Sequence, residues 1–236
     1  MSTLALGWRR ITAGTPRNAG DMTSKTVQSE KAPRARNARG EGERLRDEII
    51  AAAIKVLSTI GAEDPFSLRA VAKEAEIAAP SVYIHFADRD VLLLAVLEKL
   101  FREQVAIRAA AEAEAARAGG GPWERLLARS IAAVEFGLKH PGHYKALFEG
   151  RVVLRLSDPR IADFGRPLLA RTIELIREIK PISAKARVSS DPQRLALLLW
   201  SGLHGVISLR INKPTLDWPS ATELAEQITR AIIQPK

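Results

Sequence analysis

Three histidines, His140, His143 and His204, are the side chains best suited to proton transfer or metal binding in this chain. Glu135 and Glu149 lie near the first two in sequence, so a small helical enzyme with a histidine base is one interpretation. The chain has no cysteine, which excludes thiol catalysis, thiolate metal sites and disulfides. Because no tight set of carboxylates accompanies the histidines, we expect neither a metal nor a cofactor, and we expect His140 to lie at a helix C-terminus.

Sequence motifs that are typical of catalysis do not occur here. There is no nucleophile elbow, no glycine-rich phosphate loop and no HExxH pair. We therefore assign no catalytic residue and expect a protein that is not an enzyme. The helical enzyme and a protein-interaction bundle remain alternatives to the interpretation below.

The elements that position the remaining polar residues are predicted to be helices. Apolar residues recur every three or four positions from Leu45 to Ile60, which predicts a first helix that Gly61 ends. Ser67 is a suitable N-cap for a second helix over 68–75, and a three-residue break precedes a short third helix over 79–84. Asp88 can cap a long fourth helix that reaches Ala116 and measures about 40 Å.

The rest of the chain also has helical periodicity. We expect helices over 123–139, around 144–148, over 161–179 with a kink at Pro167, from Pro192 to 211, and from Pro219 onward. No strand pattern and no internal repeat is present, so the fold class is all-α.

Net charge is +9, but it is unevenly distributed. Residues 1–40 have eight basic and two acidic side chains and no apolar periodicity, which predicts a disordered basic arm, and Met22 is a possible true start. Residues 41–90 have six basic and ten acidic side chains, so charge alone is a weak argument for nucleic acid. No stretch contains the roughly 18 apolar residues of a membrane-spanning helix, and no membrane partner is expected.

The three short helices with a tight turn between the second and third predict a helix-turn-helix unit over 41–88, followed by a helical domain over 89–236. In such a unit the second helix crosses the phosphate backbone and the third enters the major groove. Val82 and Phe86 are expected to pack inward, and Tyr83 to point outward.

The stretches 67–75 and 80–86, with Arg89 and Leu92 after them, resemble the tetracycline-repressor (TetR/AcrR-like) family of transcriptional regulators. The resemblance covers about 45 residues and implies a sequence-specific DNA-binding regulator. It further implies that Ser67, Tyr83, His85 and Arg89 contact phosphates and that residues 79–83 face base edges. A repressor is the commoner type in this family.

Three positions depart from the family pattern. Glu76 stands where the family often has Gly, so a left-handed backbone there would be strained. Ala78 stands where a Ser or Thr cap is common, and Arg89 replaces Lys with its charge kept.

The third predicted helix has no Arg, Lys, Asn or Gln, and therefore cannot form bidentate pairs with guanine or adenine. We expect specificity from Ala79 and Pro80 against thymine methyl groups, from the Ser81 hydroxyl, from Arg69 at the groove edge, and from DNA shape. Arg44 could contact a phosphate, although a solvated position is the commoner case.

The last two predicted helices are expected to form a homodimer, because one copy reads too little DNA and a two-fold dimer reads a palindromic double-stranded operator. The stretch 200–210 resembles a C-terminal subtype of the family named for Trp-His-Gly. Trp200 and His204 share one helix face and are interpreted equally as core residues or as a pocket wall. The expected interface residues are Gly202, Gly205, Leu209, Leu224 and Ile228.

An apolar cavity in the second domain is expected to bind an unknown small-molecule effector. Its expected lining residues are Phe136, Tyr144, Phe148, Phe164, Trp200 and His204. Effector binding would act through the long fourth helix to change the spacing of the two helix-turn-helix units in the dimer, and so release the operator. The expected location is the cytoplasm.

Overall fold

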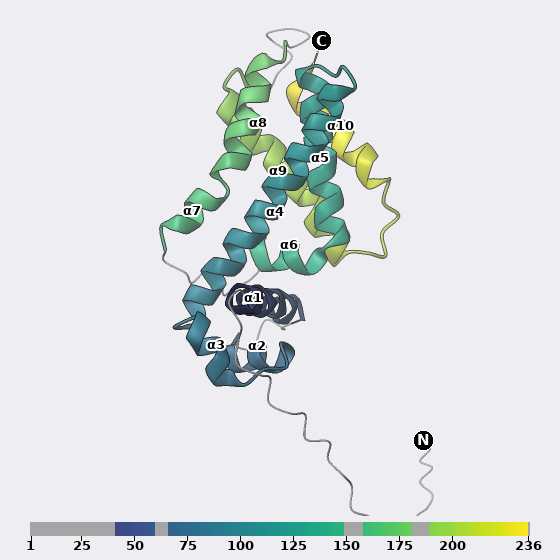
Figure 1. Ribbon diagram of the computed structural model, residues 1–236. Coiled ribbons are helices and arrows are strands. Elements are labelled where there is room, and N and C mark those ends of the chain that lie inside the picture. Colours follow the sequence, from purple (N-terminus) through teal and green to yellow (C-terminus); the bar gives the residue numbers. More distant parts are fainter. Residues whose placement is uncertain (1–40, 60–65, 149–157, 181–188, 236) are drawn as a thin grey trace, which may run out of the picture. The chain divides into compact units, whose positions relative to one another are not determined.

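The computed structural model describes residues 41–59, 66–148, 158–180 and 189–235, and these ranges are helical without a β-strand. The all-α prediction is confirmed. Figure 1 shows the arrangement of the helices. Their bounds are α1 (Glu41–Thr59), α2 (Leu68–Glu74), α3 (Ala79–His85), α4 (Arg89–Arg117), α5 (Pro122–Lys139), α6 (Pro141–Phe148), α7 (Arg160–Phe164), α8 (Arg166–Glu178), α9 (Pro192–Asn212) and α10 (Ala221–Ile233).

Two predicted helix boundaries are wrong. The helix expected over 161–179 is two helices, α7 and α8, which are separated at Gly165, and Pro167 lies in the first turn of α8. A proline there loses no hydrogen bond, so it starts a helix and does not kink one. Pro219 lies outside α10, because Ser220 is the N-cap and its hydroxyl accepts a hydrogen bond from the Glu223 N–H at 3.1 Å.

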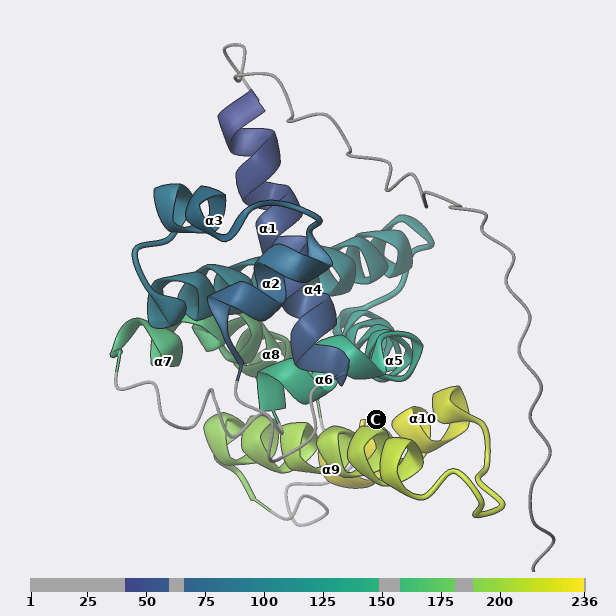
Figure 2. The same ribbon diagram turned by 90° about the horizontal axis from the view of Figure 1, so that it is seen from below.

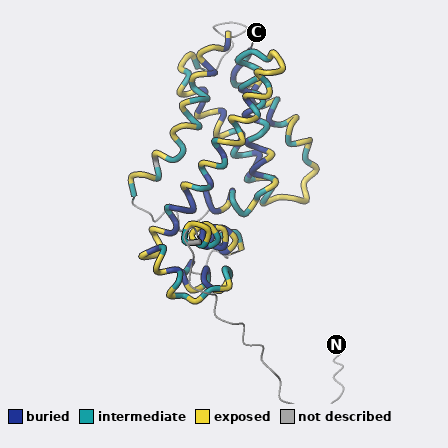
Figure 3. The backbone as a smooth tube through the Cα atoms, viewed as in Figure 1, coloured by how far each residue is buried: buried dark blue, intermediate teal, exposed yellow. Residues whose placement is uncertain are grey.

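The helix-turn-helix elements share one apolar core with α1, α4 and α6. Ile49 from α1, Val71 from α2 and Val82 from α3 are fully buried, and Leu147 from α6 belongs to the same cluster. Figure 3 shows the buried inner sides of these helices against their exposed outer sides. The first four helices are therefore anchored to α6, and their core is not separate from the rest of the chain.

A second core lies among α5, α8, α9 and α10. Its fully buried members include Leu126, Leu175 and Leu195. The long helix α4 packs alongside α5 and also contacts α1, so it connects both cores (Figure 1). Gly119, at a φ of 82°, follows the last turn of α4, where a left-handed residue is favoured.

The most apolar helix is α9. By length and composition it could cross a membrane, contrary to our expectation. Only 33% of its most apolar stretch of 18 residues is buried within the chain. An apolar face of α9 is therefore left on the surface. The predictions for the arm over 1–40, for Met22 and for Gly61 lie outside the described residues.

Candidate nucleic-acid interface and effector cavity

The turn between α2 and α3 is fixed by local hydrogen bonds. The Ser67 hydroxyl accepts the Ala70 N–H at 3.2 Å, which confirms Ser67 as the N-cap of α2. Glu76 has a φ of 52°, so the predicted left-handed residue is present without a glycine. The Ile77 N–H then bonds back to the Ala72 carbonyl at 3.0 Å, and α3 begins after Ala78, which provides no side-chain cap. The helix-turn-helix geometry thus forms despite both departures.

One side of α3 is buried and the other is exposed. Val82 and Phe86 are buried, as predicted, and the Arg46 guanidinium lies 5.1 Å from the centre of the Phe86 ring. Tyr83 is 52% exposed and Ile84 is 81% exposed. Two large side chains that point away from a well-packed helix are available for contact with another molecule.

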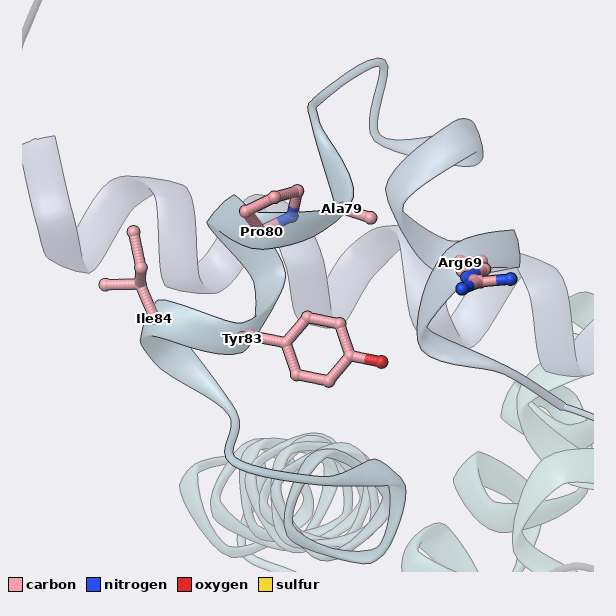
Figure 4. Close-up of a pocket in the computed structure, with 5 residues that line it drawn as sticks. All are labelled: Arg69, Ala79, Pro80, Tyr83 and Ile84. Carbon is pink, nitrogen blue, oxygen red and sulfur yellow. The ribbon is translucent and has the colours of Figure 1, made fainter.

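An open hollow lies on this outer side of the unit. Figure 4 shows the side chains that line it, with the Tyr83 ring to the left of the Arg69 guanidinium and Ala79 above and between them. Its lining residues are Arg69, Ala79, Pro80, Tyr83 and Ile84. Figure 2, from below, shows α2 and α3 facing the viewer in front of α4 and α6. The hollow therefore brings together Arg69, Ala79, Pro80 and Tyr83 of the predicted DNA contacts, but not Ser81, and adds Ile84, which the sequence reasoning missed.

The residues predicted to contact phosphates have different surroundings. Arg89 is exposed and its Nε lies 3.2 Å from Asp90 Oδ1, while Arg44 lies 3.0 Å from Glu48. His85 and Ser81 are half-buried. The Arg89 pair is exposed and joins neighbours on one helix, and such pairs contribute little free energy.

The second domain contains a cavity of about 450 Å³. A volume of this size suits a small molecule. Its walls come from α4, α5, α6, α7, α8 and α9, and most of them are apolar. The lining residues are Leu97, Phe101, Gln104, Arg108, Leu126, Arg129, Ser130, Ala133, Tyr144, Leu147, Phe148, Ile161, Gly165, Arg166, Leu168, Leu169, Thr172, Ala196, Leu199, Trp200, Leu203, His204 and Ile207.

Four of the six residues predicted to bind the effector are found in the cavity lining, and two are not. Tyr144, Phe148, Trp200 and His204 line the cavity. Phe136 instead packs against the His140 ring, 4.9 Å between centres, and Phe164 packs against Phe101 at 6.2 Å. Each phenylalanine lies on a wall helix but is not among the lining residues of the cavity. Trp200 is 45% exposed and is therefore a wall residue, not a core residue.

His204 is held by an aromatic hydroxyl. The Tyr144 hydroxyl lies 2.9 Å from His204 Nδ1 and donates to the His204 carbonyl at 3.2 Å, so the pair is satisfied when Nδ1 carries a proton. Burial, together with the charge of Arg108, lowers the pKa of His204 to about 4. The imidazole is therefore neutral at physiological pH.

A buried carboxylate joins three wall helices next to the cavity. Glu112 of α4 binds Arg125 at 2.6 Å and Arg129 at 3.0 Å, both from α5, and Arg171 of α8 at 2.6 Å. Burial alone would raise the pKa of Glu112, but hydrogen bonds from Arg171 and Arg125 and the charge of Arg129 lower it to about 2. The sequence reasoning missed this cluster, because its members are widely separated along the chain.

The predicted interface residues divide into two groups. A Cβ on Gly202 would lie 2.8 Å from Ile228 Cγ2, so these two residues pack together between α9 and α10 of one chain. Leu224 also packs on the second core. By contrast, a Cβ on Gly205 would meet nothing within 4 Å, and Leu209 is 51% exposed. Gly202, Ile228 and Leu224 are thus largely occupied within the chain, while Gly205 and Leu209 lie on the open face of α9.

The histidines at the α5–α6 junction form no metal site among the described residues. His140 is the C-cap of α5, as predicted, and its ring stacks on that of His143 with 5.1 Å between centres. Burial lowers the pKa of His143, although Glu103 lies 3.8 Å away. The junction therefore has a packing role.

Comparisons with known proteins agree with this geometry. Residues 49–96 match the model of the bacterial regulatory proteins of the tetR family, and residues 126–232 match the tetracyclin repressor-like C-terminal domain. The Trp-His-Gly subtype stays a prediction. No curated protein sequence matches the chain.

Solved structures with the same fold include several regulators. The putative regulatory protein SCO4313 is 23% identical over 82% of this chain and 97% of its own, with a TM-score of 0.64. A TetR-like transcriptional regulator from Rhodococcus sp. RHA1 is 22% identical over 82% of this chain and 96% of its own, with a TM-score of 0.58. The fatty acid degradation regulator FadR from Bacillus halodurans is 17% identical over 80% and 94%, with a TM-score of 0.62. At these identities the likeness concerns the fold.

The two family models together span more than half of the chain, and each falls on the part that has the corresponding geometry: the first on the helix-turn-helix unit and the start of α4, the second on the cavity-forming helices. The chain belongs to the tetracycline-repressor family and is a DNA-binding transcriptional regulator.

Proposed function

We propose that this regulator is a homodimeric repressor of a palindromic operator, and that a small molecule in the cavity releases it from DNA. One observation carries the proposal. The cavity walls include α4 and α6, and both helices also pack into the core of the helix-turn-helix unit. A ligand that moves either helix therefore acts on the DNA-reading surface.

The reading surface in this proposal is the outer side of α3. Ala79, Pro80 and Ile84 offer apolar contacts to thymine methyl groups, the Ser81 hydroxyl offers a hydrogen bond, and Arg69 lies at the edge of the same hollow. The residues that contact phosphates on either side of the DNA major groove are, in this proposal, Ser67, Tyr83, His85, Arg89 and Arg44. The Ser67 hydroxyl is an acceptor within α2, so its proton is available to a phosphate oxygen.

The dimer interface in this proposal is the open face of α9. Leu197, Ser201, Gly205 and Leu209 are spaced four residues apart and so lie along one side of the helix. The two leucines are 40% and 51% exposed, and Gly205 leaves room for a second helix. A two-fold partner on this face would cover the apolar surface and bring two α3 helices to half-sites about 34–36 Å apart or a multiple of that.

The coupling route in this proposal runs through α6 as well as α4. Tyr144 of α6 both lines the cavity and bonds His204. At the start of α6, a Cβ on Gly142 would collide with the Ser58 side chain near the end of α1, so the two helices are in close contact there. A ligand that displaces Tyr144 shifts α6 against α1, and a tenfold loss of operator affinity needs only about 1.4 kcal/mol of differential binding.

The enzyme and interaction-bundle alternatives receive less support. His204 is hydrogen-bonded to Tyr144, and no aspartate or glutamate lies in the described cavity lining to serve as its partner. We propose that the chain acts without catalysis. Since it acts on DNA, we also place it in the cytoplasm, with no membrane partner.

The test is operator selection from random duplex DNA, followed by footprinting and mobility shift with the purified protein. We expect a palindromic site, binding by a dimer, and an affinity that falls steeply with salt. Arg69→Ala should weaken operator binding, whereas Arg102→Ala, a change of an exposed arginine on α4, should not. A strictly monomeric protein, or one that selects no sequence at low salt, would contradict the proposal.

A further inference from the structure

One end of the effector cavity is polar and basic. Arg108 and Gln104 reach it from α4 and Arg129 and Ser130 from α5. The Arg108 Nη2 donates to Gln104 Oε1 at 3.1 Å. The Nε atoms of Arg108 and Arg129 are buried and have no hydrogen-bond partner in the described part of the chain. Buried donors without partners are rare in proteins, so these two point to a missing acceptor.

The charges of the cavity do not balance. Three arginines line it, and no aspartate or glutamate is among its described lining residues. Arg129 is paired with Glu112, and Arg166 lies 2.6 Å from Asp163. Arg108 forms no ion pair with any described acidic residue, and its only side-chain partner is the neutral Gln104. Within the part of the chain that the structure describes, one positive charge therefore remains without a counter-charge.

This charge persists at physiological pH. Burial and the charge of Arg129 lower the pKa of Arg108 to about 10, which still leaves the guanidinium protonated. The same cation, after burial itself, disfavours protonation of His204, which also lines the cavity. A guanidinium held among apolar walls is costly unless an anion pairs with it.

We infer that the effector is an apolar molecule with one anionic group, a carboxylate or a phosphate, which Arg108 binds at the polar end of the cavity. Gln104 lies beside that position, and since its Oε1 accepts from Arg108, its amide N–H groups can donate to the remaining anion oxygens. The apolar part of the molecule lies against the leucine and aromatic walls formed by residues such as Leu126, Phe148 and Leu203. The inference rests on the proposed effector site and specifies its chemistry.

Binding of four simple probes tests the inference by calorimetry on the full chain. Dodecanoate and dodecyl phosphate have the anion, dodecanol is neutral and dodecylamine is cationic, and all are used below their micelle concentrations. We expect at least one anionic probe to bind roughly tenfold or more tightly than dodecanol, as for a charge-assisted hydrogen bond, and dodecylamine to bind most weakly. A preference between the two anionic probes distinguishes a carboxylate effector from a phosphate effector.

Variants assign the preference to one residue. Arg108→Met should remove the difference between the anionic probe and dodecanol, and Arg108→Lys should keep part of it. The matched control is Arg102→Met on the same helix, where the arginine side chain is 69% exposed, and it should bind like the native chain. Should Arg108→Met fail to fold, the native chain still tests the inference, because the affinities of dodecanoate and dodecyl phosphate compared with dodecanol show whether the cavity prefers an anion.

The inference is overturned if the native chain binds dodecanol as tightly as both anionic probes, if it binds none of them, or if Arg108→Met keeps the anion preference. These results leave operator binding untouched, since it is measured without a probe. Conversely, loss of a footprint with intact anion preference would overturn the proposed function and leave this site in place.

Discussion

Ile84 has the largest exposed fraction of the large apolar side chains in the described part of the chain, at 81%. It lies on α3 beside Tyr83, while its neighbours Val82 and Phe86 hold the helix to the core. Since Ile84 contributes almost nothing to folding in this position, its apolar surface is available for a DNA contact. Burial of a side chain of this size against thymine methyl groups is worth about 1–2 kcal/mol.

We expect Ile84→Ala to weaken operator binding by roughly tenfold and to leave the melting temperature unchanged. Ile107→Ala on α4, where the isoleucine is 38% exposed, is the matched control and should not affect DNA affinity. Mobility-shift titration of both variants measures the effect. Equal affinities for the native chain and Ile84→Ala would remove Ile84 from the reading surface.

His204 makes stability depend on pH. Its pKa in the folded chain is about 4, compared with 6.5 for the free side chain, so between these values the unfolded chain binds more protons than the folded one. Its contribution to stability is therefore complete above pH 6.5 and decreases as pH falls towards 4. His143, whose pKa is also lowered by burial, acts in the same direction.

We expect the melting temperature of the native chain to decrease between about pH 7 and 5, and to decrease less in His204→Gln. His143→Gln, measured in parallel, separates the contribution of the second histidine. Scanning calorimetry at several pH values gives both slopes. An unchanged slope in His204→Gln would mean that the imidazole is not held neutral by its surroundings.

Single side chains also show what the sequence could not give. Ile84 was missed because an apolar residue at the end of a short helix is expected to be buried, and only the packing of Val82 and Phe86 turns it outward. Phe136 and Phe164 were placed in the cavity on composition alone, yet the direction of a side chain depends on the contacts of its helix with distant helices. The charge of Arg108 could not be recognised as unpaired before the partners of Arg129 and Arg166 were known.

At the level of helices, local signals were sufficient where the chemistry is local. Ser67 and Asp88 cap the helices they were predicted to cap, because a side-chain acceptor three residues before a free N–H needs no tertiary contact. The division between α7 and α8 was missed because Gly165 and Pro167 lie close together, and the proline alone was taken as the break. Helix existence was thus predictable, whereas helix contacts such as α1 with α6 were not.

Glu112 connects α4, α5 and α8 through its three arginines, and we expect Glu112→Gln to lower the free energy of unfolding by roughly 3 kcal/mol. Loss of a buried carboxylate leaves several cations facing one another. This loss is at the lower end of what is usual when a buried ion pair is broken, because the side chains of Arg125 and Arg171 are still 25% and 31% exposed. Urea denaturation measures it, with the exposed Glu114→Gln on the same helix as the control. A variant as stable as the control would show that the arginines are satisfied without Glu112.

For the assembled molecule, the decisive surface is the open face of α9. The most apolar stretch of α9, 18 residues long, is only 33% buried within one chain, although the helix contacts α8, α5 and α10. In the proposed dimer, the face along Gly205 lies against its copy, whereas the face along Gly202 is already filled by Ile228 of the same chain. Two glycines three residues apart therefore belong to two different interfaces.

This difference gives opposite expectations for the two positions. Gly205→Trp meets no atom within the chain, so each protomer should fold normally, but the indole would fill the space that the partner helix needs. Ultracentrifugation should show monomers at concentrations where the native chain is dimeric, with operator affinity reduced at least tenfold because one protomer reads one half-site. Gly202→Val should instead lower the melting temperature, since its side chain collides with Ile228. If Gly205→Trp stayed dimeric and bound the operator normally, the two-fold contact would lie elsewhere, and the spacing of the two α3 helices would have to be derived from a different face.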